Sequence, residues 1–238
     1  MNSFTASPGE NASSSAPWFT GAKVYDLLAA SPLILWYAFC VIQQVPQLLD
    51  ELASIWVREQ QFLPIIDLLS KFSVFLFTAV LIGLLVARRT PSAKAQGFFP
   101  RIAAFLGCYL GVAILVLPRH PVGWAVEVAS TAFILGGMTF ALYGLLWLGR
   151  SISIMSEARQ LVIGGPYGLV RHPLYLGEQL ALVGVSLQYM SPVALALLAL
   201  QFSFQLYRMG FEEQVLSEAF PEYEAYKART ARLIPGIY

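Results

Sequence analysis

Residues 164–177 read GGPYGLVRHPLYLG and lie between two long apolar segments. Pro166 and Pro173 each fix φ and disfavour a helical conformation in the residue before them. This predicts a rigid, non-helical loop over residues 165–173 at a membrane surface. The loop region offers aromatic faces, a permanent cation and a titratable ring, in Tyr167, Arg171, His172 and Tyr175. That combination indicates a functional site rather than a linker.

The composition predicts an integral membrane protein. Of the 238 residues 57% are hydrophobic and only 12% are charged, whereas an ordinary soluble domain has about 25% charged residues. The net charge of +1 provides no basic field for binding a nucleic acid. The chain has two histidines and two cysteines, and no Cys/His cluster of the kind that holds zinc. We therefore expect neither a nucleic acid nor a metal as partner.

The apolar runs predict an all-α fold, a polytopic transmembrane helix bundle of about six spans. The expected spans are residues 31–49, 65–87, 102–117, 122–148, 174–189 and 193–209. Ser31 and Pro32 resemble a helix cap and a first-turn proline. The first and fifth spans are the weakest, so the alternative is that one of them is re-entrant. We divide the chain into a disordered tail (1–17), four N-terminal spans (18–148) and a C-terminal core (149–238) with a polar, amphipathic end.

The distribution of Lys and Arg predicts the orientation. Basic residues gather in alternate connections: Arg88, Arg89, Lys94 and Arg101 in one, Arg150, Arg159 and Arg171 in the central loop, and Lys227, Arg229 and Arg232 near the C-terminus. The other connections carry only Arg58 and Arg119. By the positive-inside rule both termini and the central loop face the cytoplasm. The membrane would be the inner membrane of a bacterium or the endoplasmic reticulum of a eukaryote.

A second set of charges ends the sixth span. Arg208 and Glu212 are four residues apart, so they share one helix face, and Glu213 follows directly. Glu178 in the fifth span lies at a similar depth. Charges at helix ends in a membrane are candidates for a functional site because burying them is costly. The alternative is an interfacial cluster in which arginines only neutralise glutamates.

Both features meet in a family resemblance. The run LVIGGPYGLVRHPLYLG, the later Glu212–Glu213 pair with Leu216, and the sequence FPEYEAYKARTARLIPGIY together resemble the isoprenylcysteine carboxyl methyltransferase family. The resemblance covers residues 148–238. Members of this family are integral-membrane enzymes that use S-adenosylmethionine as cofactor, and the resemblance implies that residues 149–238 form such a methyltransferase core.

The resemblance also implies roles for particular residues. Arg208 would bind the carboxylate of the acceptor, as the catalytic residue. The cofactor would contact the backbone of Gln160, Leu161 and Val162, the ring of Tyr167, the segment His172, Pro173, Leu174 and Tyr175, and Glu212 from the opposite helix. We assign the neighbouring charges Arg171 and Glu213 to the same cofactor site. His172 has an equal alternative role, which is to tie the loop by hydrogen bonds.

The acceptor remains open at this stage. The family points to an amphiphilic substrate that enters from the bilayer, such as a prenylated cysteine carboxylate, while related enzymes methylate phospholipid amines or small thiols. Two other classes are compatible with the sequence. One is a membrane reductase that uses a nicotinamide cofactor, and the other is a non-catalytic protein that binds lipid headgroups. In either case membrane lipids surround the spans.

Overall fold

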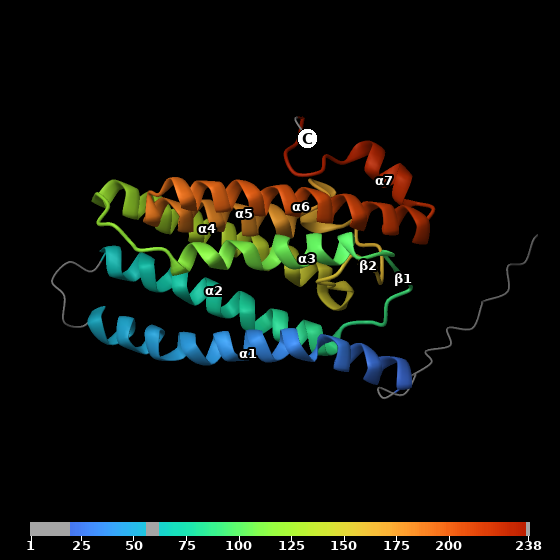
Figure 1. The fold of residues 1–238 in the computed structure, drawn as a ribbon, viewed down its shortest axis with the longest axis horizontal. Coiled ribbons are helices and arrows are strands. Elements are labelled where there is room, and N and C mark those ends of the chain that lie inside the picture. The colour runs from blue at the N-terminus through green and yellow to red at the C-terminus, as the bar shows by residue number, and fades with distance from the viewer. Residues whose placement is uncertain (1–19, 56–61, 237–238) are drawn as a thin grey trace, which may run out of the picture.

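The computed structural model describes residues 20–55 and 62–236, and the chain forms the predicted all-α helix bundle (Figure 1). The predicted tail (1–17) and Arg58 lie outside the described residues. The long elements run in chain order, with α3 continued by the 3-10 helix η1: α1 (Gly21–Ile55), α2 (Phe62–Ala87), α3 (Phe99–Tyr109), η1 (Leu110–Val116), α4 (Trp124–Leu148), α5 (Pro173–Tyr189) and α6 (Pro192–Ala219).

Five segments of the described chain are long and apolar enough to cross a membrane, judged by length and composition: Gly21–Ile55, Pro64–Ala87, Phe99–Val116, Trp124–Ser151 and Pro192–Ala219. The predicted fifth span forms α5, which has 17 residues. A helix of that length is about 25 Å long, shorter than the roughly 30 Å of a hydrocarbon core. It packs against α4, α6 and η1, so it is enclosed largely by protein.

Two helix boundaries differ from the prediction. The first span begins at Gly21, and Pro32 lies inside it. A proline has no N–H to donate to the carbonyl four residues earlier, and Ser31 Oγ donates to that carbonyl, Leu28 O, at 2.8 Å. Ser31 thus satisfies a backbone carbonyl inside the helix, whereas we predicted that it caps the start of a helix. The sixth helix continues past the apolar run to Ala219, because its charged residues are paired within the bundle.

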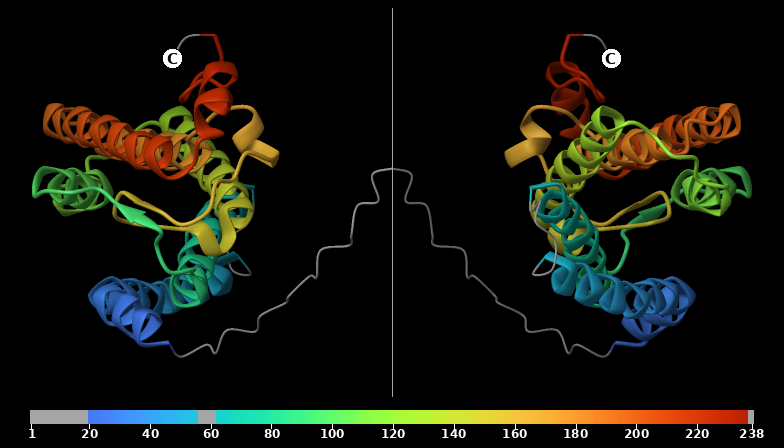
Figure 2. Two further views of the ribbon diagram at one scale, coloured as in Figure 1. Left: turned by 90° about the vertical axis from the view of Figure 1, so that its right-hand side faces the viewer. Right: turned by 90° about the vertical axis from the view of Figure 1, so that its left-hand side faces the viewer.

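Viewed end-on, α1 and α2 form one side of the bundle and α3 with α6 the other (Figure 2). The closest approach is between α4 and α5. A Cβ atom placed on Gly137 would lie 2.6 Å from Gly177 O, and one placed on Gly177 would lie 2.6 Å from Gly137 O. The backbones therefore touch without side chains between them, as small residues allow between helices in lipid. Ser130 Oγ adds a hydrogen bond of 2.8 Å to Gly184 O across the same contact.

The connections that we predicted to share one side of the membrane lie at one end of the bundle. Strand β1 (Ala93–Lys94) pairs antiparallel with β2 (Glu157–Ala158), and Lys94 Nζ lies 3.1 Å from Glu157 Oε1. The same end holds η2 (Gly149–Ser151), η3 (Gly165–Gly168), α7 (Tyr223–Arg229) and the start of α1 (Figure 1). The assignment of this end to the cytoplasm stays a prediction.

The glycine contact gives a test with an internal control. Gly137→Ala should lower the stability by about 1 to 3 kcal/mol, because the added methyl group overlaps the α5 backbone. Gly136→Ala should be neutral or slightly stabilising, because a Cβ there meets no atom within 4 Å and alanine favours a helix. Thermal unfolding in detergent measures both. Equal effects of the two substitutions would contradict the close α4–α5 contact.

Candidate functional site

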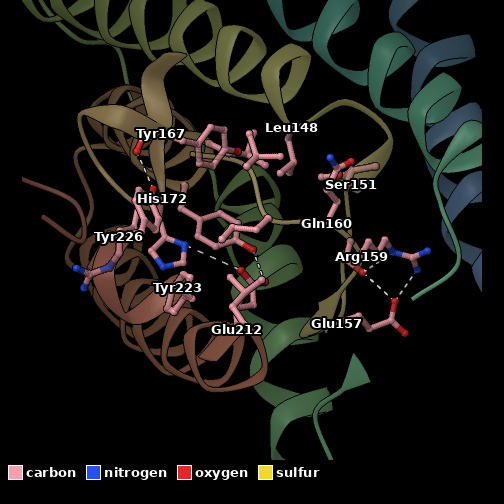
Figure 3. A pocket seen from close by; sticks show the side chains of 18 residues that line it. Leu148, Ser151, Glu157, Arg159, Gln160, Tyr167, His172, Glu212, Tyr223 and Tyr226 are labelled. Carbon is pink, nitrogen blue, oxygen red and sulfur yellow. Dashed lines mark hydrogen bonds and ion pairs between the residues drawn. The ribbon is translucent and has the colours of Figure 1, made fainter. Parts of the chain in front are cut away.

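A pocket opens at the end of the bundle that carries β1, β2 and α7 (Figure 3). Its empty volume is about 720 Å³, including the part that is open to solvent. The lining comprises Leu148, Ser151, Ile152, Ser153, Glu157, Arg159, Gln160, Leu161, Val162, Tyr167, Arg171, His172, Leu174, Tyr175, Glu212, Leu216, Tyr223 and Tyr226.

The structure brings most of the predicted site residues to this pocket. The predicted residues that line it are Gln160, Leu161, Val162, Tyr167, Arg171, His172, Leu174, Tyr175 and Glu212. Pro173, Arg208 and Glu213 do not line it, although each is next to or in contact with a lining residue. All of their roles toward a cofactor or acceptor stay predictions.

Sequence reasoning missed the wall that runs from Leu148 to Arg159. This segment precedes the recognised motif, and it has no repeat or glycine pattern that would mark it. Its signal was the basic charge of Arg150 and Arg159, which the sequence analysis uses only for orientation. Tyr223 and Tyr226, from the amphipathic C-terminal end, also line the pocket.

The prediction of a non-helical loop over residues 165–173 is wrong at both ends, where helical structure forms. Gly165–Gly168 forms a 3-10 turn with Pro166 near its start, and Pro173 is the first residue of α5. The fixed φ of proline suits a first helical position, so both prolines begin helices here. Gly165 has φ 58° and packs against the ring of Trp147, where a Cβ atom would lie 2.3 Å from the ring. Only glycine fits this turn.

Glu213 joins the loop to the C-terminal segment. Its carboxylate, in a residue that is 2% exposed, lies 2.9 Å from Arg171 Nε, 3.1 Å from His172 Nε2 and 2.6 Å from Arg232 Nη2. Two backbone hydrogen bonds also join the loop to the C-terminal segment. Arg171 N donates to Ala231 O at 2.8 Å and His172 N donates to Arg232 O at 3.1 Å. The alternative of a neutralising ion cluster therefore describes Glu213 and its partners well.

Glu212, one residue earlier, faces the pocket. Tyr175 Oη donates a hydrogen bond of 2.5 Å to Glu212 Oε1, and the rings of Tyr175 and His172 stack with centroids 5.4 Å apart. Arg208 Nε lies 3.2 Å from Glu212 Oε1, which is the predicted i, i+4 pair. Glu212 thus places a carboxylate at the floor of the pocket, next to aromatic rings, and Glu157 is the other carboxylate of the described lining.

Arg208 lies behind this floor and is 3% exposed. Its Cζ sits 4.6 Å from the centroid of the Tyr175 ring, its Nη1 donates to Cys108 Sγ at 2.9 Å and its Nη2 to Ser153 O at 3.4 Å. The guanidinium therefore touches three lining residues from the side of the bundle interior.

Burial, hydrogen bonds and neighbouring charges together set the protonation of three pocket residues outside the membrane spans. Burial raises the pKa of Tyr226 to about 12 and also raises the pKa of Tyr167, next to the negative charge of Glu212. Burial opposes ionisation of Glu157, but the hydrogen bond from Ser153 and the charges of Arg159 and Lys94 prevail, so its pKa lies below the usual value. Near neutral pH the pocket therefore has protonated tyrosines and an ionised Glu157.

The comparisons with known proteins agree with the resemblance. Residues 125–223 match the family model described as phospholipid methyltransferase, a family related to the isoprenylcysteine carboxyl methyltransferases. The match thus begins inside α4, earlier in the chain than the motifs indicated. It supports a methyltransferase embedded in the membrane by its apolar helices.

Two curated proteins are similar to this chain. The nickel-cobalt-cadmium resistance protein NccN of Alcaligenes xylosoxydans xylosoxydans is 36% identical over 102 residues, which are 42% of this chain and 47% of the relative. The cobalt-zinc-cadmium resistance protein CzcN of Cupriavidus metallidurans is 35% identical over 102 residues, with the same coverage. The matched part of the chain thus spans about half the length of each relative.

The two pocket tyrosines of α7 provide a test of how the C-terminal segment is held. Tyr226 Oη donates a hydrogen bond of 2.7 Å to Tyr167 O, whereas Tyr223 Oη has no hydrogen-bond partner among the described residues. Tyr226→Phe should lower the stability by about 1 kcal/mol, and Tyr223→Phe should leave it nearly unchanged. Thermal unfolding in detergent compares them. A larger loss of stability in Tyr223→Phe than in Tyr226→Phe would contradict a stabilising role of the hydrogen bond from Tyr226 to Tyr167 O.

Proposed function

We propose that this chain is an integral-membrane methyltransferase that takes its methyl group from S-adenosylmethionine. The observation that carries the proposal is the coincidence of the family match with the pocket. Every lining residue except Tyr226 falls within residues 125–223. The part of the chain that resembles methyltransferases is thus the part that builds the cavity.

The lining suits this cofactor chemically. S-adenosylmethionine supplies a methyl group on a cationic sulfur, and the faces of Tyr167 and Tyr175 can lie against adenine or attract the cation. Glu212 can accept hydrogen bonds from ribose hydroxyls or from the amino group of the cofactor. Gln160, Leu161 and Val162 also line the pocket, and their backbone offers further hydrogen-bonding groups. These residues would hold the cofactor from several sides.

This reaction requires no covalent nucleophile from the protein. Methyl transfer is an in-line displacement, so the protein must align donor and acceptor and exclude water. The buried rings of Tyr167 and Tyr175 can exclude water from the pocket floor. Glu212 keeps its hydrogen bond from Tyr175, which fixes the carboxylate in one orientation.

We further propose that the acceptor is amphiphilic, enters from the bilayer and presents a carboxylate, as an isoprenylcysteine does. The support is Arg208, whose planar guanidinium matches a carboxylate in two-pronged geometry and lies on the interior side of Tyr175 and Glu212. An acceptor there would exchange one of the present partners of Arg208, such as Cys108 Sγ, for its own oxygens. Arg208 would orient the acceptor and would not act as a base.

Cofactor binding is the experiment that tests the function. The protein purified in detergent should bind S-adenosylmethionine or its demethylated product, S-adenosylhomocysteine, in isothermal titration calorimetry. NADPH should give no heat of binding. Binding of NADPH without either adenosyl compound would favour the reductase, and binding of lipid alone would favour a non-catalytic protein.

The roles of Glu212 and Arg208 should separate in kinetics. Glu212→Ala should weaken cofactor binding, because a hydrogen bond to a charged group is worth about 1.5 to 3 kcal/mol. Arg208→Lys keeps the charge but loses the planar fork, so it should depress methyl transfer far more than cofactor binding. Glu218→Ala is the control, since Glu218 is on α6 but is exposed and outside the pocket. Full activity in Arg208→Lys would show that Arg208 only forms a structural ion pair and does not orient the acceptor.

A further inference from the structure

A second buried carboxylate lies next to the pocket and comes from a part of the chain that the family match does not cover. Asp26 is in the second turn of α1 and is 4% exposed. It binds two guanidinium groups at once: Arg88 Nε at 2.8 Å and Arg159 Nη2 at 3.1 Å. Arg88 also donates to the backbone carbonyl of Asp26 at 3.1 Å. One acidic residue of the first helix thus joins the end of α2 to the central loop.

Arg159 carries this connection into the pocket. Its side chain is completely buried, and besides Asp26 it binds Glu157 Oε2 at 2.6 Å, Ser153 Oγ at 3.2 Å and the carbonyl of Arg89. Arg159, Glu157 and Ser153 all line the pocket. Figure 3 shows Arg159 and Glu157 paired beside Gln160 at one edge of the site. The pocket wall formed by residues 153–162 is therefore bound by the guanidinium of Arg159, which is itself bound by Asp26 on the side away from the pocket.

The charges explain why Asp26 matters for the position of this wall. Arg88 and Arg159 approach the same carboxylate, and two buried cations repel each other unless an anion lies between them. Glu157 is shared with Lys94, at 3.1 Å, so it does not replace Asp26. Without the negative charge of Asp26, the two guanidinium groups would move apart and Arg159 would shift with the pocket wall.

Backbone hydrogen bonds should keep the change local. Arg89 N donates to Arg150 O at 2.8 Å, Ser92 N to Ala158 O at 2.8 Å and Ala95 N to Ser156 O at 2.9 Å. These bonds hold the connection after α2 to the central loop independently of Asp26. Loss of the Asp26 charge is thus expected to release Arg159 and loosen its contacts to Glu157 and Ser153 rather than to unfold the bundle.

We propose that Asp26 is a positioning residue for the pocket, which acts through Arg159 to set the wall from Ser153 to Val162. The inference rests on the proposed function in one respect, because it takes the ligand of that wall to be the adenosyl cofactor. It gives α1 a part in the site. The first helix would then supply an electrostatic support to a pocket built almost wholly from residues 125–223.

Asp26→Asn tests the proposal in the full chain, since it keeps the size of the side chain and removes its charge. Affinity for S-adenosylhomocysteine should fall by about tenfold. The control is Glu51→Gln, which removes a carboxylate from the other end of the same helix, where Glu51 Oε2 lies 2.9 Å from Lys71 Nζ. That variant should bind as the unaltered protein does. Unchanged affinity in Asp26→Asn, with binding by the unaltered protein, would overturn the proposal and leave the proposed function standing.

A double-mutant cycle distinguishes positioning from a general loss of stability. If Asp26 acts through Arg159, the substitution Asp26→Asn should cause little further loss of affinity in a protein that already carries Arg159→Gln. Fully additive losses would show that Asp26 supports only the α1–α2 pair and would overturn the proposal.

Hydrogen exchange supplies a readout that needs no cofactor. The backbone amides of residues 153–162 should exchange faster in Asp26→Asn than in the unaltered protein, whereas Glu51→Gln should leave them unchanged. If the unaltered protein binds neither adenosyl compound, the proposed function is wrong, and the exchange result still decides the role of Asp26. Identical exchange in Asp26→Asn and the unaltered protein would overturn that role.

Discussion

The carboxylate of Glu213 is the interaction on which the site depends. It is buried among the guanidinium groups of Arg171 and Arg232 and the imidazole of His172, two from the loop before α5 and one from the segment after α7. Placing a charge in an apolar surrounding is costly unless it is paired and hydrogen-bonded, and the chain meets this condition by bringing distant segments to one point. The loop, α6 and the C-terminal segment are held together there, and the pocket is the space that they leave beside it.

Two neighbouring glutamates show what sequence could and could not predict. The Glu212–Glu213 pair was recognisable, but successive residues of a helix point about 100° apart, so only one of them can face the pocket. The sequence does not reveal the phase of α6 relative to the loop, and both were assigned to the cofactor. In the structure Glu212 lines the pocket and Glu213 holds its wall. The position of the loop is predictable because its prolines and glycines act locally, but the helical turn over Gly165–Gly168 within it is not.

The contacts of Asp26 mark the limit of sequence reasoning. The apolar runs predicted the long helices to within a few residues at most ends, because hydrophobicity is a local property. Asp26, however, precedes the run that we took as the first span, and its partner Arg159 lies 133 residues later. Pairings over such distances follow from the packing of α1 against α2 and of α2 against α4. No spacing of residues along the sequence predicts these pairings.

The bond between Glu213 and Arg232 has a consequence for how the protein is made. Synthesis proceeds from the N-terminus, and Arg232 follows Glu213 by 19 residues. All of the long helices, including α6, have been translated before the segment that pairs with the loop exists. Until then Glu213 has only Arg171 and His172 as partners, and the tyrosines of α7 have not reached the pocket. The site can therefore be completed only after all of the long helices have been made.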